Sequence, residues 1–164
     1  NSGISKLIKS HEGKNLWNLS LDPKVPLDLS MKLGAGSGKV DLSGTNIQSL
    51  VLSTGAGEST IYLQNTSVPE IDLKTAVGEV LLDMSGQWNN SNRTVISGGL
   101  GELTIVVPKD IGVRARISGL LGEIRHPFTQ SGNYYTNALY GTTEHSLELI
   151  ISAGIGQVNI READ

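Results

Sequence analysis

Short blocks of alternating apolar and polar residues recur along the chain, and each block contains a glycine at an equivalent position. From the first of these marker glycines to the last, the spacings are 21, 21, 23, 21 and 34 residues. The markers are Gly36, Gly57, Gly78, Gly101, Gly122 and Gly156. A spacing that holds over this many copies indicates internal structural repeats.

Mostly apolar or β-branched residues stand at fixed distances from each marker. Seven and five positions before it are Leu29 and Met31, Leu50 and Leu52, Ile71 and Leu73, Thr94 and Ile96, Ala115 and Ile117, and Leu149 and Ile151. Four positions after it are Val40, Ile61, Leu82, Ile105, His126 and Ile160. Alternation with a period of two predicts one strand before each marker, such as residues 50–52, and a second strand after it. No segment has a convincing period of 3.6 residues, so we expect little helix.

The glycine-rich segment STGAGESTIYL, residues 53–63, has the composition of a phosphate-binding loop. In such loops, however, the glycines lead into a helix whose N-terminus holds the anion. Here a β-branched run follows the glycines, and the same pattern recurs in the other copies. The glycines therefore predict tight bends, where the backbone adopts angles that a Cβ disfavours, and not a nucleotide site.

We interpret the chain as a single-domain, all-β, right-handed parallel β-solenoid (β-helix) with repeats of about 21 residues, because stacked coils keep equivalent apolar positions in phase. An antiparallel β-sandwich or meander is the alternative, with Gly-x-Gly closing hairpins. We assign residues 1–26, with Trp17, to an N-terminal cap and residues 27–164 to the solenoid, with a long loop at 127–143.

Composition limits the possible partners. The chain of 164 residues suits one domain, with a core that must be aliphatic because aromatic residues make up only 4%. A net charge of −3 without a basic stripe argues against nucleic-acid binding. No apolar run reaches the length of a membrane span, so we expect any membrane attachment to come from a segment outside this chain.

An insertion that lengthens the last repeat is the first candidate for a recognition site. The segment 126–145 contains Phe128, Tyr134, Tyr135 and Tyr140. Loops on rigid scaffolds commonly carry recognition, and tyrosine-rich loops form compact contact surfaces. The alternative is that this loop folds over the side or end of the solenoid and shields its core.

Trp88 is the second candidate, because it lies in the polar segment SGQWNNSNR, residues 85–93. An exposed tryptophan there would stack on a sugar or on a partner protein. The competing interpretation places Trp88 against the edge of the core.

A glutamate follows four of the markers, and these residues are Glu58, Glu79, Glu102 and Glu123. Stacked coils would place the four carboxylates in one ladder, where a divalent cation with oxygen ligands could neutralise them. The spacing of a calcium loop is missing, so we interpret the row as solvated residues and expect no metal and no cofactor.

Catalysis has little support in the sequence. The three histidines are scattered, the chain has no cysteine, and no Gly-x-Ser-x-Gly motif is present. Glu70, Asp72 and Asp83 were considered as paired acids of a polysaccharide-cleaving β-helix, but they occupy ordinary outward positions of strands. We therefore expect a protein that is not an enzyme.

The phased copies, in forms such as LSTGAGESTIYL and LIISAGIGQVNI, resemble the toast-rack domain of bacterial envelope proteins, which is akin to cell wall-active antibiotic response proteins and to proposed surface adhesins. The resemblance covers about residues 27–162 and implies a non-catalytic interaction or scaffold module in envelope-stress sensing or adhesion. The expected partner is an envelope protein or a cell-wall glycan. The expected location is the extracytoplasmic face or surface of a bacterial cell envelope, with a cytoplasmic membrane-associated location as the alternative. A carbohydrate-binding or polysaccharide-cleaving β-helix is the alternative function.

Overall fold

The computed structural model describes the backbone of residues 5–11, 14–20, 24–119 and 121–164, and the side chains of residues 24–99, 101–119 and 121–164. The described residues form strands and connecting turns. None of them forms a helix that is both long and apolar enough to cross a lipid bilayer.

The strands form three sheets. The two-stranded sheet contains β1 (Ser5–His11) and β2 (Lys14–Ser20). The six-stranded sheet contains, in spatial order, β12 (Leu121–Arg125), β16 (Ile155–Glu162), β10 (Leu100–Val107), β8 (Val77–Asp83), β6 (Gly57–Tyr62) and β4 (Gly38–Asp41). The eight-stranded sheet contains β13 (Thr129–Ser131), β14 (Tyr134–Thr136), β11 (Gly112–Ser118), β15 (Ser146–Ser152), β9 (Asn92–Ser97), β7 (Glu70–Thr75), β5 (Ile47–Thr54) and β3 (Leu27–Leu33).

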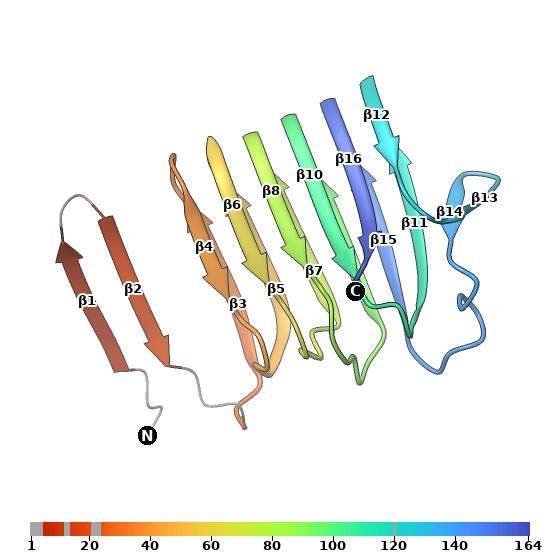
Figure 1. The fold of residues 1–164 in the computed structure, drawn as a ribbon. Helices are drawn as coiled ribbons and strands as arrows, with labels where there is room; N and C mark the ends of the chain where they lie inside the picture. The colour runs from red at the N-terminus through yellow and green to blue at the C-terminus, as the bar shows by residue number, and fades with distance from the viewer. Residues whose placement is uncertain (1–4, 12–13, 21–23, 120) are drawn as a thin grey trace.

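From β3 to β12 successive strands alternate between the two large sheets, and β15 and β16 do the same; we call two such consecutive strands with the bend between them a coil. Along the chain, β3, β5, β7 and β9 lie in the eight-stranded sheet, and β4, β6, β8 and β10 follow them in the six-stranded sheet (Figure 1). Neighbouring coils pair in parallel in both sheets. The all-β prediction with parallel sheets is confirmed, and the parallel pairing excludes the antiparallel meander for these coils.

The order of the coils departs from chain order at one place. β15 pairs with both β9 and β11, and β16 pairs with both β10 and β12. The last coil of the chain therefore lies between the two coils that precede it, in contrast to the consecutive stack that we expected. The connection from Val107 to Gly112 must cross two strand spacings and the gap between the sheets, about 14 Å in all. Its five Cα–Cα steps can span about 17 Å, so this connection can leave room for the last coil.

Cross-strand charge pairing favours this order. In register, Glu148 of β15 lies between Arg93 of β9 and Arg114 of β11. Glu148 forms ion pairs with both arginines, at 3.7 Å to Arg93 and 2.5 Å to Arg114. If β11 were paired directly with β9 in the same register, the two arginines would face each other, and like charges in opposite positions are destabilising.

The core lies between the two large sheets and consists of the in-phase apolar residues. In the six-stranded sheet, Val40, Ile61, Leu82, Ile105 and Ile160 lie in one buried register row. In the eight-stranded sheet the corresponding row is Leu29, Leu50, Ile71, Thr94, Leu149 and Ala115. Period-two alternation therefore predicted the inward faces correctly. His126 is the exception, because β12 ends one residue before it.

The N-terminal cap remains a prediction. Strands β1 and β2 pair antiparallel in a sheet of their own. The side chain of Trp17 lies outside the described side chains.

Candidate interaction surface at the glycine bend

The marker glycines form a column across the six-stranded sheet, in which each glycine packs on the backbone of the spatially neighbouring coil. Gly57 pairs with Gly78, Gly78 with Gly101, and Gly101 with Gly156. At Gly101 the φ angle is +136°, and a Cβ there would lie 1.9 Å from the carbonyl oxygen of Gly78. These contacts leave no room for a side chain at Gly57, Gly78, Gly101, Gly122 or Gly156.

The residues before the last markers form an exposed apolar row, which we call the apolar ridge. It consists of Val77, Ile155 and Leu121, whose exposed fractions are 51%, 56% and 70%. The backbone of Leu100 lies between those of Val77 and Ile155, and Ile155 pairs with Leu121. This ridge is not among the candidate sites that the sequence indicated. Its signal was the residue before each marker, which changes from alanine in the first two copies to valine, leucine or isoleucine in the others.

The glutamates that follow the markers form a second row beside the ridge. Glu58, Glu79 and Glu102 are in register on β6, β8 and β10, and all three are exposed. An open hollow of about 240 Å³ lies over these strands. We call Glu58, Glu79 and Glu102 the acidic row.

The expected ladder of four carboxylates is interrupted. Because β16 lies between β10 and β12, Gln157 separates Glu102 from Glu123. Glu123 accepts two hydrogen bonds from Arg125, at 2.8 and 2.9 Å. The bond from Arg125 holds the pKa of the Glu123 carboxyl below its ordinary value. Among the side chains that the structure describes, no group of three or more His, Cys, Asp or Glu residues could hold a metal ion.

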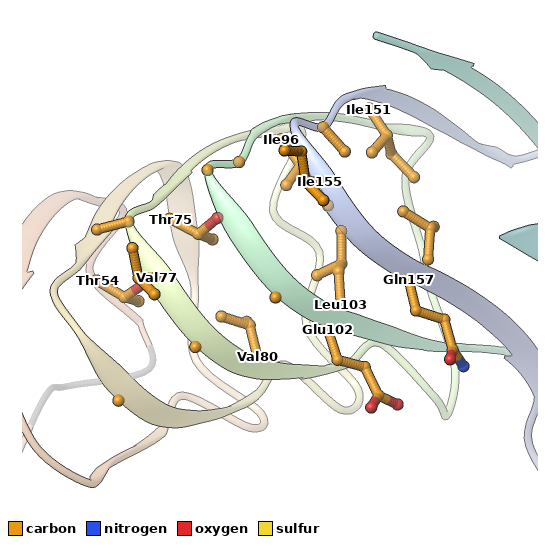
Figure 2. A pocket seen from close by; sticks show the side chains of 18 of the residues that line it. Thr54, Thr75, Val77, Val80, Ile96, Glu102, Leu103, Ile151, Ile155 and Gln157 are labelled. Atoms are coloured by element: carbon orange, nitrogen blue, oxygen red, sulfur yellow. The ribbon is translucent and has the colours of Figure 1, made fainter. Parts of the chain in front are cut away.

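A narrow crevice lies between the ridge and the core (Figure 2). Its volume is about 30 Å³. Val77 and Ile155 stand at the starts of β8 and β16, and Thr54 and Thr75 line the crevice from the ends of β5 and β7. Small-molecule pockets enclose about 300–1,000 Å³, so this crevice is too small for a sugar or a cofactor.

The aromatic insertion covers the end of the eight-stranded sheet. β13 and β14 form an antiparallel hairpin, and β14 pairs antiparallel with β11. Phe128 is only 8% exposed and belongs to the core, against which Tyr135 also packs. The ring centroids of His126 and Tyr135 are 4.3 Å apart. For these residues the arrangement matches the shielding interpretation of the loop rather than the recognition interpretation.

Tyr134 and Tyr140 are both engaged with Arg114. The Arg114 guanidinium lies 4.8 Å from the centroid of the Tyr134 ring and 5.0 Å from that of Tyr140. Its hydrogen bond to Glu148 raises the pKa of Arg114 above the ordinary value. Both tyrosines are half-buried, so their rings hold the loop against β11. A role for these two tyrosines in binding stays a prediction.

Replacing Arg114 should loosen this loop. We expect Arg114→Ala to lower the free energy of unfolding by about 1–3 kcal/mol, because the variant loses two cation–π contacts and a charged hydrogen bond. Hydrogen exchange of residues 129–136 should become faster than in the parent protein. Arg116→Ala, an exposed residue of the same strand, is the matched control and should change neither measurement. Equal exchange rates in both variants would contradict the proposed role of Arg114.

Trp88 lies in the core and not on an exposed loop surface. It is 7% exposed, and its indole N–H donates a hydrogen bond of 2.7 Å to the carbonyl of Met84. The prediction that Trp88 is exposed for stacking on a sugar or a partner is therefore wrong. The structure agrees with the competing interpretation, since a turn can place one large apolar residue inward while its neighbours stay in solvent.

Two of the three acidic residues that are candidates for catalysis, Asp72 and Asp83, have separate, local partners. Asp72 forms an exposed ion pair with Lys74 at 3.7 Å. Asp83 accepts hydrogen bonds from the backbone of Ser85 and from the side chain of Gln64. Asp72 and Asp83 also lie in different sheets, on β7 and β8 respectively.

Comparisons with known proteins agree with this architecture. A family model described as Toast_rack_N, the N-terminal domain of toast_rack (DUF2154), matches residues 2–74 and 49–106, which together span more than half of the chain. The chain is similar to the crystal structure of a proposed cell adhesion protein from Clostridium sporogenes ATCC 15579. The two are 29% identical with a TM-score of 0.67, and the match covers 98% of this chain and 76% of that chain. No curated protein matches the chain.

Proposed function

Because the chain belongs to the family of the N-terminal domain of toast_rack, we propose that it is a non-catalytic contact module at the surface of a bacterial cell envelope, and that it binds another protein through the apolar ridge. The similar solved structure, described as a proposed cell adhesion protein, supports a role in adhesion or in contact between envelope proteins. We also propose that the domain that contains the ridge is a solenoid with coils of about 21 residues. We expect it to be right-handed, since parallel crossovers are right-handed in about 98% of cases.

The single observation that carries this function is the placement of exposed aliphatic side chains on adjacent strands. Isolated exposed apolar residues are common and need no explanation. In the ridge, Ile155 lies beside Leu121. Val77 lies two strands from Ile155, in the same register row at the starts of the strands. Burying one such side chain completely contributes about 1.5–3 kcal/mol to association, so the three together can anchor a partner.

The acidic row indicates the charge of the partner. Glu79 lies two residues beyond Val77 on β8, and both side chains are exposed. A partner that covers the ridge therefore has carboxylates beside it. We propose that the bound segment is apolar along one line and carries lysine or arginine along the adjacent line, and that binding weakens as salt concentration rises.

Removing the ridge should abolish partner binding without unfolding the protein. We expect the triple variant Val77→Ser, Ile155→Ser, Leu121→Ser to retain the partner at least about tenfold less well, because it loses the aliphatic surface. Exposed substitutions outside special features change stability by no more than about 0.5 kcal/mol each, so the variant should stay folded by circular dichroism. The measurement is retention of proteins from solubilised bacterial envelope on the immobilised chain.

Two other exposed valines provide the matched control. Val25→Ser with Val51→Ser removes aliphatic surface elsewhere on the molecule and should retain the same partner as the parent. Equal retention by the parent and the ridge variant would overturn the proposal. If no protein is retained by the parent, the proposal also fails, and a glycan screen would test the carbohydrate-binding alternative.

A further inference from the structure

The coil of β11 and β12 lies at one end of both large sheets, and the two sheets differ in whether another strand covers this end. In the eight-stranded sheet, β14 covers the edge of β11 at Arg114 and Ala115. In the six-stranded sheet, β12 is the terminal strand, and no strand in the described part of the chain pairs with its outer edge (Figure 1). An uncovered strand edge is a template for pairing with another chain.

The backbone groups that face outward on β12 can be assigned from its pairing with β16. The amide of Leu121 donates to the carbonyl of Gly154 at 2.8 Å, so Leu121 points its backbone groups toward the sheet. Consecutive residues of a strand direct these groups to opposite sides. Gly122 and Ile124 therefore present their N–H and C=O groups at the open edge.

The charges of β12 complement themselves in one antiparallel register. Glu123 and Arg125 are two residues apart, so they lie on the same face of the sheet, and both are exposed. A two-fold axis at Ile124 places Glu123 of each copy opposite Arg125 of the other. The same axis makes Ile124 and its symmetry mate a hydrogen-bonded pair, which agrees with the outward direction of their backbone groups. An axis at Glu123 would place two carboxylates opposite each other and would join backbone groups that already bond to β16.

We propose that two copies of this chain associate antiparallel along β12, around a two-fold axis at Ile124, so that their six-stranded sheets become one continuous sheet. This inference goes beyond the proposed function, because it does not depend on the ridge or on its partner. An edge of five residues buries little area, so the dissociation constant is on the order of 100 μM. Dimerisation would present two ridges together and increase the avidity for an envelope partner.

Charge exchange on β12 tests the proposed register. Sedimentation equilibrium over a concentration series should show a monomer–dimer equilibrium for the parent chain. Glu123→Arg and Arg125→Glu should each weaken dimerisation at least about tenfold, because each variant places like charges opposite each other. An equimolar mixture of the two variants should dimerise again, since each copy then faces the opposite charge.

Matched controls separate the register from net charge and from folding. Lys109→Glu and Glu144→Arg make the same changes in net charge at exposed positions outside β12, and both should dimerise like the parent. Restored dimerisation in the mixture also shows that each single variant is folded. A parent that stays monomeric at millimolar concentration, or a mixture that stays monomeric, would overturn the proposal.

Cross-linking provides a second test, because the chain contains no cysteine. Residues 123 and 125 of the two copies would form a non-hydrogen-bonded pair with a Cα–Cα distance of about 4.5 Å, which is within the range of a disulfide. A mixture of Glu123→Cys and Arg125→Cys should therefore form disulfide-linked dimers faster under oxidising conditions than either variant alone. Equal rates in the three samples would exclude this register.

Discussion

Gly101→Ala is expected to unfold the protein or to remove at least about 4 kcal/mol of its stability, a large fraction of the about 5–15 kcal/mol that is typical of a domain. The added Cβ would lie 1.9 Å from the carbonyl oxygen of Gly78, which belongs to the backbone of a paired strand and cannot move aside alone. Gly101 is also packed closely against the strand on its other side, since a Cβ at Gly156 would lie 1.8 Å from the carbonyl oxygen of Gly101. Urea unfolding followed by circular dichroism measures the loss.

Gly36→Ala isolates the contribution of the backbone angle. Gly36 also has a positive φ, +119°, but a Cβ there would have no other atom within 4 Å. We expect this variant to lose only about 1–2 kcal/mol, the cost of holding a side chain in that conformation. If the two variants lose the same amount, close packing of the glycine column contributes nothing to stability.

Trp88→Ala is expected to lower the free energy of unfolding by about 3–5 kcal/mol, because it leaves a cavity where a large side chain was buried. The carbonyl of Met84 also loses the hydrogen bond from the indole, which adds about 1 kcal/mol. Thermal and urea unfolding measure this loss. An exposed binding residue would behave differently, since its replacement should change stability by less than about 0.5 kcal/mol.

Trp88→Phe is the control that keeps most of the ring in place. This variant loses the hydrogen bond to Met84 but leaves a much smaller cavity, so it should stay folded and retain the same envelope partner as the parent. Loss of partner binding by folded Trp88→Phe would show that Trp88 contributes to recognition after all. Trp88 would then act indirectly, through the exposed residues that cover its buried ring.

The glycine bends and the core were predictable because they depend on local rules. Leu50 and Leu52 lie on the same face of a strand whatever the strand pairs with, and both are buried. The positive φ at each marker glycine is equally local, since the chain turns there in every coil, whereas the close packing of one marker on the next is not. These features could be read from spacing alone.

The candidate surface was less predictable. The glutamates were recognised from their positions after the markers, but the ridge was overlooked because an apolar residue within a strand is usually assigned to the core. Leu121, at the start of β12, is nevertheless 70% exposed. For Trp88 the sequence left two interpretations open, because its polar neighbours favoured a surface position while its large apolar ring favoured the edge of the core.

The sequence by itself determined that the chain forms coils, which residues of each coil face inward, and which residues of different coils are equivalent. It could not determine the order of the last two coils, because the repeat pattern alone allows Gly156 to lie between Gly101 and Gly122 or beyond Gly122. The tertiary structure decided that order. Placing β15 between β9 and β11 puts Glu148 between Arg93 and Arg114, and placing β16 between β10 and β12 separates two exposed carboxylates by Gln157. These interactions join residues from three coils, so they become favourable only after the coils are assembled, and they also determine which strand remains at the open edge.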